Sequence, residues 1–233
     1  MLKPIRFLIL VLMGLQLLHP GRDAVAVDWA GKRTQMVLMD LMPRGIWSPS
    51  VLKVMKRVPR HEFVPKHIRK LAYADRPLPI GEGQTISQPY VVAWMSQLLE
   101  IKKGMKVLEI GTGSGYLTAL LAEITARVFT VEFVPELADK ARETLDSLGY
   151  QNVEYRIGDG TQGWAHNAPF DGIIASASAN RVPTQLTSQL APGARMIIPV
   201  GDLQQHLVMV HKGDEQAEAT TLLPVRFVQM HSY

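Results

Sequence analysis

The chain has 233 residues, of which 47% are hydrophobic and 20% charged, a composition and length that suit one globular α/β domain better than two independent domains. It contains no cysteine, which excludes disulfides, thiolate zinc sites and cysteine nucleophiles, and its seven histidines form no close pair, so no metal site is expected. The net charge of +4 comes from scattered basic residues, a pattern that does not indicate nucleic-acid binding.

Residues 1–26 are typical of an export signal. Two basic residues precede an apolar run from Phe7 to Leu18, and positions 24–26 read Ala-Val-Ala, like a cleavage site. This run of 12 residues is too short to cross a bilayer, so no stable membrane insertion is expected. The alternatives are an uncleaved extension or a native start nearer Met36. The fold is therefore assigned to residues 27–233, as a single domain.

Two short amphipathic helices are predicted next. Apolar residues recur at helical spacing over residues 32–42, before a proline and a glycine end the pattern. The second helix has Ser48 as its N-cap and ends before Pro59. His61 and His67 follow, and both are expected to be solvated rather than catalytic.

Residues 77–89 are rich in glycine and proline. Such a segment cannot be a regular helix or a central strand, so it is predicted to be an ordered loop or a binding lid. Directly before it, Asp75 and Arg76 are expected either to pair with each other beneath the loop or to touch the substrate. A helix over residues 89–100 follows.

Short apolar strands then alternate with helices. The strands are predicted at 107–110, 128–131, 153–157, 172–175 and 196–200, and the helices at 116–124, 135–148 and 184–190, the last ending in Pro192-Gly193. This alternation predicts a doubly wound, Rossmann-like parallel sheet with helices. Residues 207–211 and 222–230, on either side of a turn at 212–215, predict an antiparallel C-terminal hairpin.

A glycine-rich loop lies between the first of these strands and its helix. Residues 109–115 read Glu-Ile-Gly-Thr-Gly-Ser-Gly, and the glycines let the backbone approach a ligand closely. In the dinucleotide-binding motif the third glycine follows the second by three positions, where this chain has Tyr116. The spacing therefore favours a methionine-bearing nucleoside over a pyrophosphate. The predicted cofactor-binding residues of this loop are Glu109, Gly111, Thr112, Gly113, Ser114 and Gly115.

Acidic residues follow the next two strands. Glu132 stands 21 residues after Gly111, where a carboxylate can accept hydrogen bonds from both ribose hydroxyls. Asp159, before Gly160, is placed to accept from the adenine amino group. Each residue alone could be structural, since Glu132 could be a surface charge and Asp159 a turn cap. Together, at successive strand ends, they predict a site for S-adenosylmethionine, with no metal.

One long motif carries a resemblance to a known family. Residues 74–90 read ADRPLPIGEGQTISQPY, which resembles protein-L-isoaspartate O-methyltransferases, as do residues 58–60 with 63–65, 107–116, 158–160 and 198–201. The resemblance extends from about Arg33 to Val228. It implies methyl transfer from S-adenosylmethionine to the free α-carboxylate of L-isoaspartyl residues in damaged proteins, which starts repair through a succinimide.

The resemblance also implies roles for single residues. The family's active-site serine corresponds to Ser87, and the adjacent Thr85, Ile86 and Gln88 belong to the loop that covers the cofactor. The family fold adds N-terminal helices over the cofactor. The chain departs from the family pattern at Ala194, at residues 175–180 and at Gln229-Met230, which replaces a Pro-Leu pair and bears on acceptor affinity rather than on chemistry.

The expected reaction needs no general base, because a carboxylate with a pKa of about 4 is already ionised at neutral pH. The enzyme then has to align the reactants and exclude water, which can contribute up to ~7–11 kcal/mol. We expect the neutral hydroxyl of Ser87 to orient the acceptor carboxylate. The alternative, that Ser87 caps the helix beginning at Pro89, is compatible with this role.

Two other functions stay open: a methyltransferase of the same fold with a different acceptor, and a non-catalytic nucleoside-binding protein. Amino-group methylation of nucleic acid usually needs an Asn/Asp-Pro-Pro-aromatic loop, whereas residues 175–178 read Ala-Ser-Ala-Ser. The expected partners are damaged proteins rather than nucleic acid, and the expected state is a monomer. A cytoplasmic location is expected because the methyl donor is made there, with the periplasm as the alternative suggested by residues 3–26.

Overall fold

The computed structural model describes residues 27–213 and 216–230. The predicted export signal, residues 1–26, lies outside the described residues. Within the described ranges, none of the helices combines the length and the apolar character that a membrane crossing requires.

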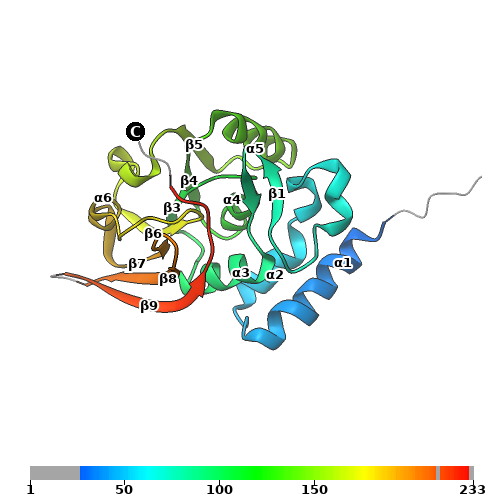
Figure 1. Ribbon diagram of the computed structural model, residues 1–233, viewed down its shortest axis with the longest axis horizontal. Helices are drawn as coiled ribbons and strands as arrows, with labels where there is room; N and C mark the ends of the chain where they lie inside the picture. Colours follow the sequence, from blue (N-terminus) through cyan, green and yellow to red (C-terminus); the bar gives the residue numbers. More distant parts are fainter. Residues whose placement is uncertain (1–26, 214–215, 231–233) are drawn as a thin grey trace, which may run out of the picture.

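A seven-stranded sheet forms the centre of the fold, in the order β5-β4-β3-β6-β7-β8-β9 (Figure 1). The first five strands in this order run parallel, and the last two pairings, β7–β8 and β8–β9, are antiparallel. This topology confirms the predicted Rossmann-like sheet with a C-terminal hairpin. The strands are β3 (Lys106–Ile110), β4 (Arg127–Glu132), β5 (Val153–Ile157), β6 (Phe170–Ala175), β7 (Leu190–Val200), β8 (Gln205–Lys212) and β9 (Ala217–Val225).

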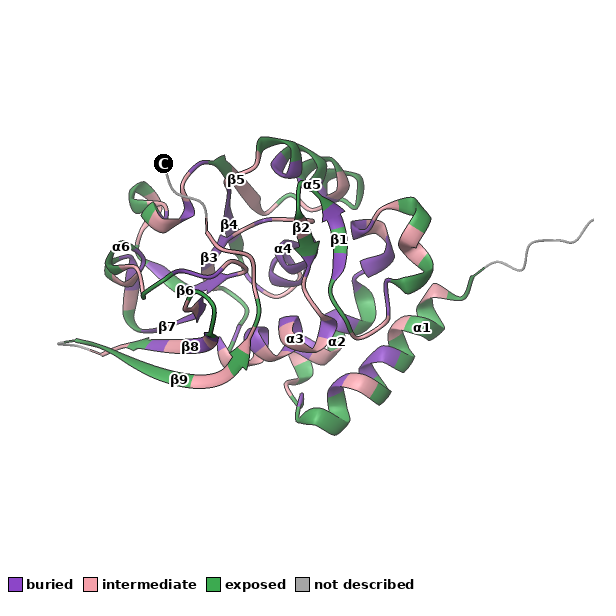
Figure 2. Cartoon of the chain, in the orientation of Figure 1, coloured by how far each residue is buried: buried purple, intermediate pink, exposed green. Residues whose placement is uncertain are grey.

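Apolar residues on both faces of the sheet are buried, because helices and loops cover each face (Figure 2). In β3, Val107 joins the core cluster that contains α2, α3 and α4, whereas its neighbour Leu108 joins the cluster on the opposite face with Leu186 of α6. The α-helices are α1 (Trp29–Met36), α2 (Pro49–Arg57), α3 (Pro89–Leu98), α4 (Tyr116–Ala122), α5 (Pro135–Ser147) and α6 (Thr184–Ser188).

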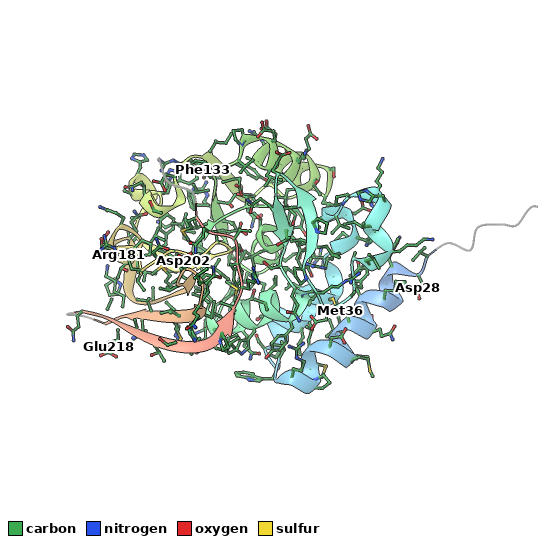
Figure 3. The ribbon with its side chains drawn as sticks, viewed as in Figure 1. Asp28, Met36, Phe133, Arg181, Asp202 and Glu218 are labelled. Atoms are coloured by element: carbon green, nitrogen blue, oxygen red, sulfur yellow. The ribbon has the colours of Figure 1, made fainter. Side chains whose placement is uncertain are left out.

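The first helix begins earlier than predicted. Asp28 is its N-cap, and the Asp28 carboxylate accepts a hydrogen bond of 2.8 Å from the backbone of Gly31. After Met36 the helix continues as a π-helical turn, η1 (Val37–Leu41), and a 3₁₀ turn, η2 (Met42–Arg44) (Figure 3). The prediction of one α-helix over 32–42 was wrong in its bounds, because apolar periodicity reports the buried face and not the cap.

The Gly/Pro-rich segment contains a small hairpin instead of a featureless loop. Its strands β1 (Leu78–Gly81) and β2 (Gln84–Ile86) pair only with each other, outside the main sheet. The turn places Glu82 and Gly83 at φ angles of 51° and 68°. Proline is tolerated here because a two-stranded hairpin leaves backbone groups of its strands free of partners.

The Pro192-Gly193 pair also lies elsewhere than predicted. Helix α6 already ends at Ser188, and the pair belongs to the irregular start of β7. There the register with β6 shifts between Leu190 and Arg195. Proline cannot donate to the strand ladder and Gly193 has a φ of +74°, which explains the irregularity.

His61 is buried, so the prediction that it is solvated was wrong, whereas His67 is exposed. The His61 ring stacks on Trp29 of α1 at 4.4 Å, and its Nδ1 lies 2.7 Å from the hydroxyl of Tyr73. These contacts attach α1 to the rest of the fold. Burial lowers the pKa of His61, an effect opposed by Glu62 and supported by nearby arginines.

We expect this burial to make stability depend on pH. Below its ordinary pKa of about 6.5, His61 binds a proton in the unfolded chain but resists it in the folded one, so its contribution to stability falls as pH drops below that value. A His61→Gln variant should therefore lose less unfolding free energy than the parent between pH 7 and pH 5. Urea unfolding at several pH values measures this, with the exposed His67→Gln as control; equal slopes for parent and His61→Gln contradict it.

Candidate functional site

The site begins where β3 ends and the chain turns into α4. Gly111 has a φ of +87°, and an added Cβ would lie 3.6 Å from the Cβ of Ser176 after β6. Gly115 has a φ of +84°, and a Cβ there would lie 3.0 Å from Leu145 of α5. The first glycine therefore permits the sharp turn at the sheet edge, and the second permits close packing of α4 on α5.

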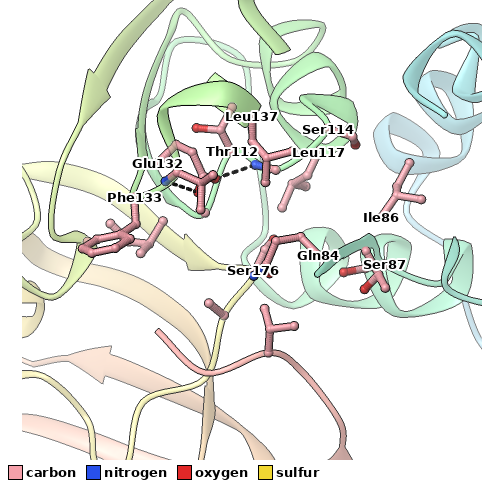
Figure 4. A pocket seen from close by; sticks show the side chains of 18 of the residues that line it. Gln84, Ile86, Ser87, Thr112, Ser114, Leu117, Glu132, Phe133, Leu137 and Ser176 are labelled. Carbon is pink, nitrogen blue, oxygen red and sulfur yellow. Dashed lines mark hydrogen bonds between the residues drawn. The ribbon is translucent and has the colours of Figure 1, made fainter. Parts of the chain in front are cut away.

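Glu132 stands at the end of the neighbouring strand, β4. Its Oε2 accepts a hydrogen bond of 2.8 Å from the backbone N–H of Gly113, and its Oε1 accepts one of 3.0 Å from that of Val134 (Figure 4). The carboxylate thus ties the glycine-rich loop to the start of α5. Only two of its lone pairs are used, so both oxygens can accept further hydrogen bonds.

A pocket opens at this carboxyl edge of the parallel strands. Its floor is the glycine-rich loop, and the hairpin β1–β2 and the C-terminal residues close it on other sides. Nine of the predicted site residues line it: Thr85, Ile86, Ser87, Gly111, Thr112, Gly113, Ser114, Glu132 and Gly160. An apolar pocket with a few fixed polar groups, among them the Glu132 carboxylate, suits a nucleoside, whose base buries apolar surface and whose ribose hydroxyls donate hydrogen bonds.

Four predicted residues lie outside this lining: Gln88, Glu109, Gly115 and Asp159. Glu109 is completely buried beneath the loop, where its Oε2 accepts hydrogen bonds from the hydroxyls of Thr118 and Thr130. Burial raises the pKa of Glu109 to about 8. Asp159 caps the 3₁₀ turn η5 (Gly160–Gln162), since its Oδ1 accepts from both the N–H and the hydroxyl of Thr161.

A second cavity adjoins the pocket. Gln88 lines it, together with residues of β9 and the segment that follows β9. Its charged lining groups are Arg44 and Arg226, and no carboxylate of the described residues lines it. Four residues line both cavities: Thr85, Ser87, Ser176 and Val228.

Ser87 therefore stands in a wall between two cavities. Among the described residues its hydroxyl has no hydrogen-bond partner, and the N-cap of α3 is Gln88 rather than Ser87. Capping of this helix consequently does not account for the serine. A hydroxyl that is half-buried and unpartnered is available to a ligand in either cavity.

Asp75 does not pair with Arg76, which corrects one of the two predicted alternatives. Its partner is Arg44, whose guanidinium also lies 3.5 Å from the centre of the Tyr90 ring. The fold brings Arg44, the last residue of η2, beside Asp75. Asp75 lies behind the second cavity instead of lining it.

The C-terminal segment after β9 forms part of the wall of both cavities. Gln205 of β8 holds it by accepting from the N–H of Phe227 at 2.6 Å and donating to the Phe227 carbonyl at 3.1 Å. Ser178 binds the segment further along, through backbone hydrogen bonds with Val228 and Met230. At the position where the chain departs from the Pro-Leu pattern, the Gln229 amide donates to the carbonyl of Gly201 at 3.0 Å.

Several pocket residues were missed by the sequence analysis. Phe133 and Leu137 follow Glu132, the last residue of β4. Because the site lies where the parallel strands end, this position could have marked them as pocket residues. Ser176 and Ala177 follow β6, the neighbour of β3, so the same strand-end rule could have found them. No local sequence pattern marks Val228 as a pocket residue, because only the tertiary fold brings it there; Gln229 and Met230, which the resemblance had singled out as a departure from the family pattern, do line the pocket.

Comparisons with known proteins agree with this architecture. A family model described as protein-L-isoaspartate(D-aspartate) O-methyltransferase matches residues 32–233. The protein-L-isoaspartate O-methyltransferase of Picosynechococcus sp. is 50% identical over 218 residues, covering 93% of this chain and 98% of the relative. That of Gloeobacter violaceus is 52% identical over 198 residues, covering 84% and 96%.

Solved structures give the same result. A protein-L-isoaspartate O-methyltransferase, 28% identical, superposes with a TM-score of 0.78 over 86% of this chain and 66% of its own. A Plasmodium falciparum protein described in the same terms, 26% identical, was solved in complex with S-adenosyl-L-homocysteine. It has a TM-score of 0.76 and covers 86% of this chain and 99% of its own.

Proposed function

The chain belongs to the protein-L-isoaspartate(D-aspartate) O-methyltransferase family, and we propose that Ser87 presents the acceptor carboxylate to a methyl donor held by Glu132 and the glycine-rich loop. It is an S-adenosylmethionine-dependent enzyme that methylates L-isoaspartyl residues of damaged proteins. The observation that carries the residue roles is the position of Ser87, which lines both the nucleoside pocket and the cavity beside it.

The residues of the pocket suit the donor. The glycine backbone at 111 leaves room for close approach, and the two Glu132 oxygens can accept from the two ribose hydroxyls. Leu117, Leu137 and Val134 supply apolar surface. Glu109 acts from beneath by holding Thr130, which lies 2.6 Å from the hydroxyl of Thr112 in the pocket lining.

The reaction is a displacement at carbon. An ionised carboxylate oxygen of the acceptor forms a bond to the donor's methyl carbon, the carbon–sulfur bond breaks, and its electron pair stays on sulfur. No proton moves, so no general base is needed. Ser87 contributes one neutral hydrogen bond that orients the carboxylate without masking its charge, and the surrounding wall excludes water.

Replacing Ser87 by alanine should lower kcat for an isoaspartyl peptide roughly 10- to 100-fold, since one hydrogen bond to a charged group is worth ~1.5–3 kcal/mol. Transfer of labelled methyl groups to a peptide pair that differs only in Asp versus isoAsp measures both activity and selectivity. The exposed Ser147→Ala serves as a control. Full turnover by Ser87→Ala contradicts the serine role, and equal labelling of the two peptides by the parent contradicts the acceptor.

The second cavity is proposed to hold the peptide around the isoaspartyl residue. Because its charged lining groups are two arginines and Arg226 has no ion pair among the described residues, acidic flanking residues should bind better than basic ones. Arg226→Glu should lower kcat/KM about 3- to 10-fold for a peptide with acidic flanks, and less for a basic one. Arg181→Glu, the same charge change outside both cavities, provides the control; an unchanged acidic-to-basic ratio contradicts this prediction.

The remaining expectations concern the cell rather than the site. We propose that the enzyme works as a monomer in the cytoplasm, where its methyl donor is made, and that it has no nucleic-acid partner. Sequencing the N-terminus of the native protein tests the location, because removal of residues 1–26 would indicate export.

A further inference from the structure

Arg60 is a buried charge whose position needs an explanation. It begins the 3₁₀ turn η3 (Arg60–Phe63) and is 0% exposed. Its Nε donates to the carbonyl of Ala72 at 2.8 Å, and its Nη2 donates to the carbonyl of Ser87, also at 2.8 Å. The guanidinium lies 4.8 Å from the centre of the Tyr116 ring, at the start of α4. One buried side chain thus joins η3, the active-site segment and the glycine-rich turn.

Burying the Arg60 guanidinium is unfavourable for the stability of the fold. Burial lowers the pKa of Arg60 to about 10, so the guanidinium still carries its charge at neutral pH. Removing a charge from water carries a large desolvation cost, and Nη1 of Arg60 has no hydrogen-bond partner in the described part of the chain. An apolar side chain of similar volume would often serve stability as well.

Asp75 holds the other side of the same segment. Its Oδ2 accepts a hydrogen bond of 2.7 Å from the side-chain amide of Gln88, and its Oδ1 accepts one of 2.9 Å from the backbone N–H of Tyr90. The chain is therefore fixed at Ser87 by a buried cation and at the next residues by an anion. Both charged groups come from the stretch between α2 and β1.

We propose that Arg60 and Asp75 are positioning residues that together hold the backbone of residues 87–90, so that the Ser87 hydroxyl faces the acceptor carboxylate at the wall between the two cavities. The inference rests on the proposed role of Ser87. Since no described residue hydrogen-bonds the Ser87 hydroxyl, its place depends on the backbone that carries it, and Arg60 holds that backbone at the Ser87 carbonyl.

The difference between an arginine and a lysine side chain makes this proposal testable. A guanidinium donates along fixed directions to two carbonyls while stacking on an aromatic ring, whereas a lysine ammonium is a compact charge that cannot reproduce all three contacts. Misplacement of a reacting group by about 1 Å can cost on the order of 100-fold in rate. Arg60→Lys should therefore keep the charge but lose the alignment.

The experiment compares Arg60→Lys and Asp75→Asn with Arg195→Lys in the full chain. Arg195 is the matched control, because it too donates to a backbone carbonyl, that of Leu98, but outside both cavities. We expect Arg60→Lys and Asp75→Asn to lower kcat at saturating isoaspartyl peptide about 10- to 100-fold. Calorimetry should show S-adenosylhomocysteine affinity within threefold of the parent, and Arg195→Lys should keep the parent kcat.

A double-variant cycle separates positioning from a general structural role. If Arg60 acts through Ser87, Arg60→Lys combined with Ser87→Ala should be no slower than the slower single variant, because both remove the same interaction. The inference is overturned if the kcat losses of the two single variants multiply in the double variant, or if Arg60→Lys keeps the parent kcat. It is also overturned if Arg60→Lys loses as much affinity for S-adenosylhomocysteine as it loses kcat. Should Arg60→Lys not fold, the same cycle with Asp75→Asn decides it. A parent that leaves the isoaspartyl peptide unmethylated defeats the proposed function instead.

Discussion

Glu132→Ala is expected to weaken S-adenosylhomocysteine binding roughly 100-fold. Each hydrogen bond to a charged partner is worth ~1.5–3 kcal/mol, and the variant removes the acceptors that we propose for two ribose hydroxyls, in a largely buried position. Since every 1.4 kcal/mol is a factor of ten, a loss of about 3 kcal/mol gives two orders of magnitude. The variant also frees the N–H groups of Gly113 and Val134, which would loosen the loop that receives the nucleoside.

Calorimetric titration with S-adenosylhomocysteine measures this effect directly. Glu136→Ala is the matched control, because Glu136 lies in the first turn of α5 only four residues away and is exposed. It removes the same charge from the same end of the sheet without touching the pocket lining. A dissociation constant for Glu132→Ala within threefold of the parent would show that the carboxylate does not hold the ribose.

The second large effect concerns Glu109 and stability. Burial raises the pKa of Glu109 to about 8. The hydrogen bonds from Thr118 and Thr130 favour the charged carboxylate and lower the pKa, but the effect of burial is larger. The pKa of Glu109 in the unfolded chain is near 4.5. At a pH between 4.5 and about 8, Glu109 is therefore protonated in the folded chain and ionised in the unfolded chain. Stability from this group is therefore present at low pH and is lost as pH rises toward 8.

Glu109→Gln removes this dependence because the amide cannot ionise. We expect the unfolding free energy of the variant, relative to the parent, to increase by a few kcal/mol, at roughly 1.4 kcal/mol per unit of pKa shift, between pH 5 and pH 8. Urea unfolding at both pH values, with the exposed Glu143→Gln as control, measures the difference. A difference that stays constant or shrinks with pH would mean that Glu109 is ionised in the folded enzyme.

The residues at the strand ends were predictable from the sequence, because a local sequence pattern marks each strand and its end. Apolar strands mark where the sheet ends, and the carboxyl ends of parallel strands meet at one edge, so the strand pattern alone places Gly111 and Glu132 together. Alternation and a turn signal also predicted the hairpin β8–β9, but the predicted second strand, 222–230, was wrong in its bounds, since β9 is Ala217–Val225. Helix and strand bounds such as those near Pro192 were less predictable, since register shifts depend on neighbouring strands.

Contacts between distant segments could not be predicted in this way. Nothing near Arg60 in the sequence shows that its guanidinium reaches the carbonyl of Ser87, 27 residues later. Likewise, the sequence does not show that His61, expected to be solvated, stacks on Trp29 of α1, or that Glu109, expected to bind the cofactor, is enclosed by threonines outside the pocket lining. Their roles follow from burial and partners, which only the assembled fold defines.

The wall that separates the two cavities has a consequence for the order of events. Thr85, Ser87, Ser176 and Val228 line both cavities, so a nucleoside that ordered them from one side would leave less to be ordered when a peptide arrived on the other. Thermodynamic reciprocity then requires the peptide to tighten the nucleoside by the same factor. Release of the spent, demethylated donor should accordingly be faster after the esterified peptide has left than before.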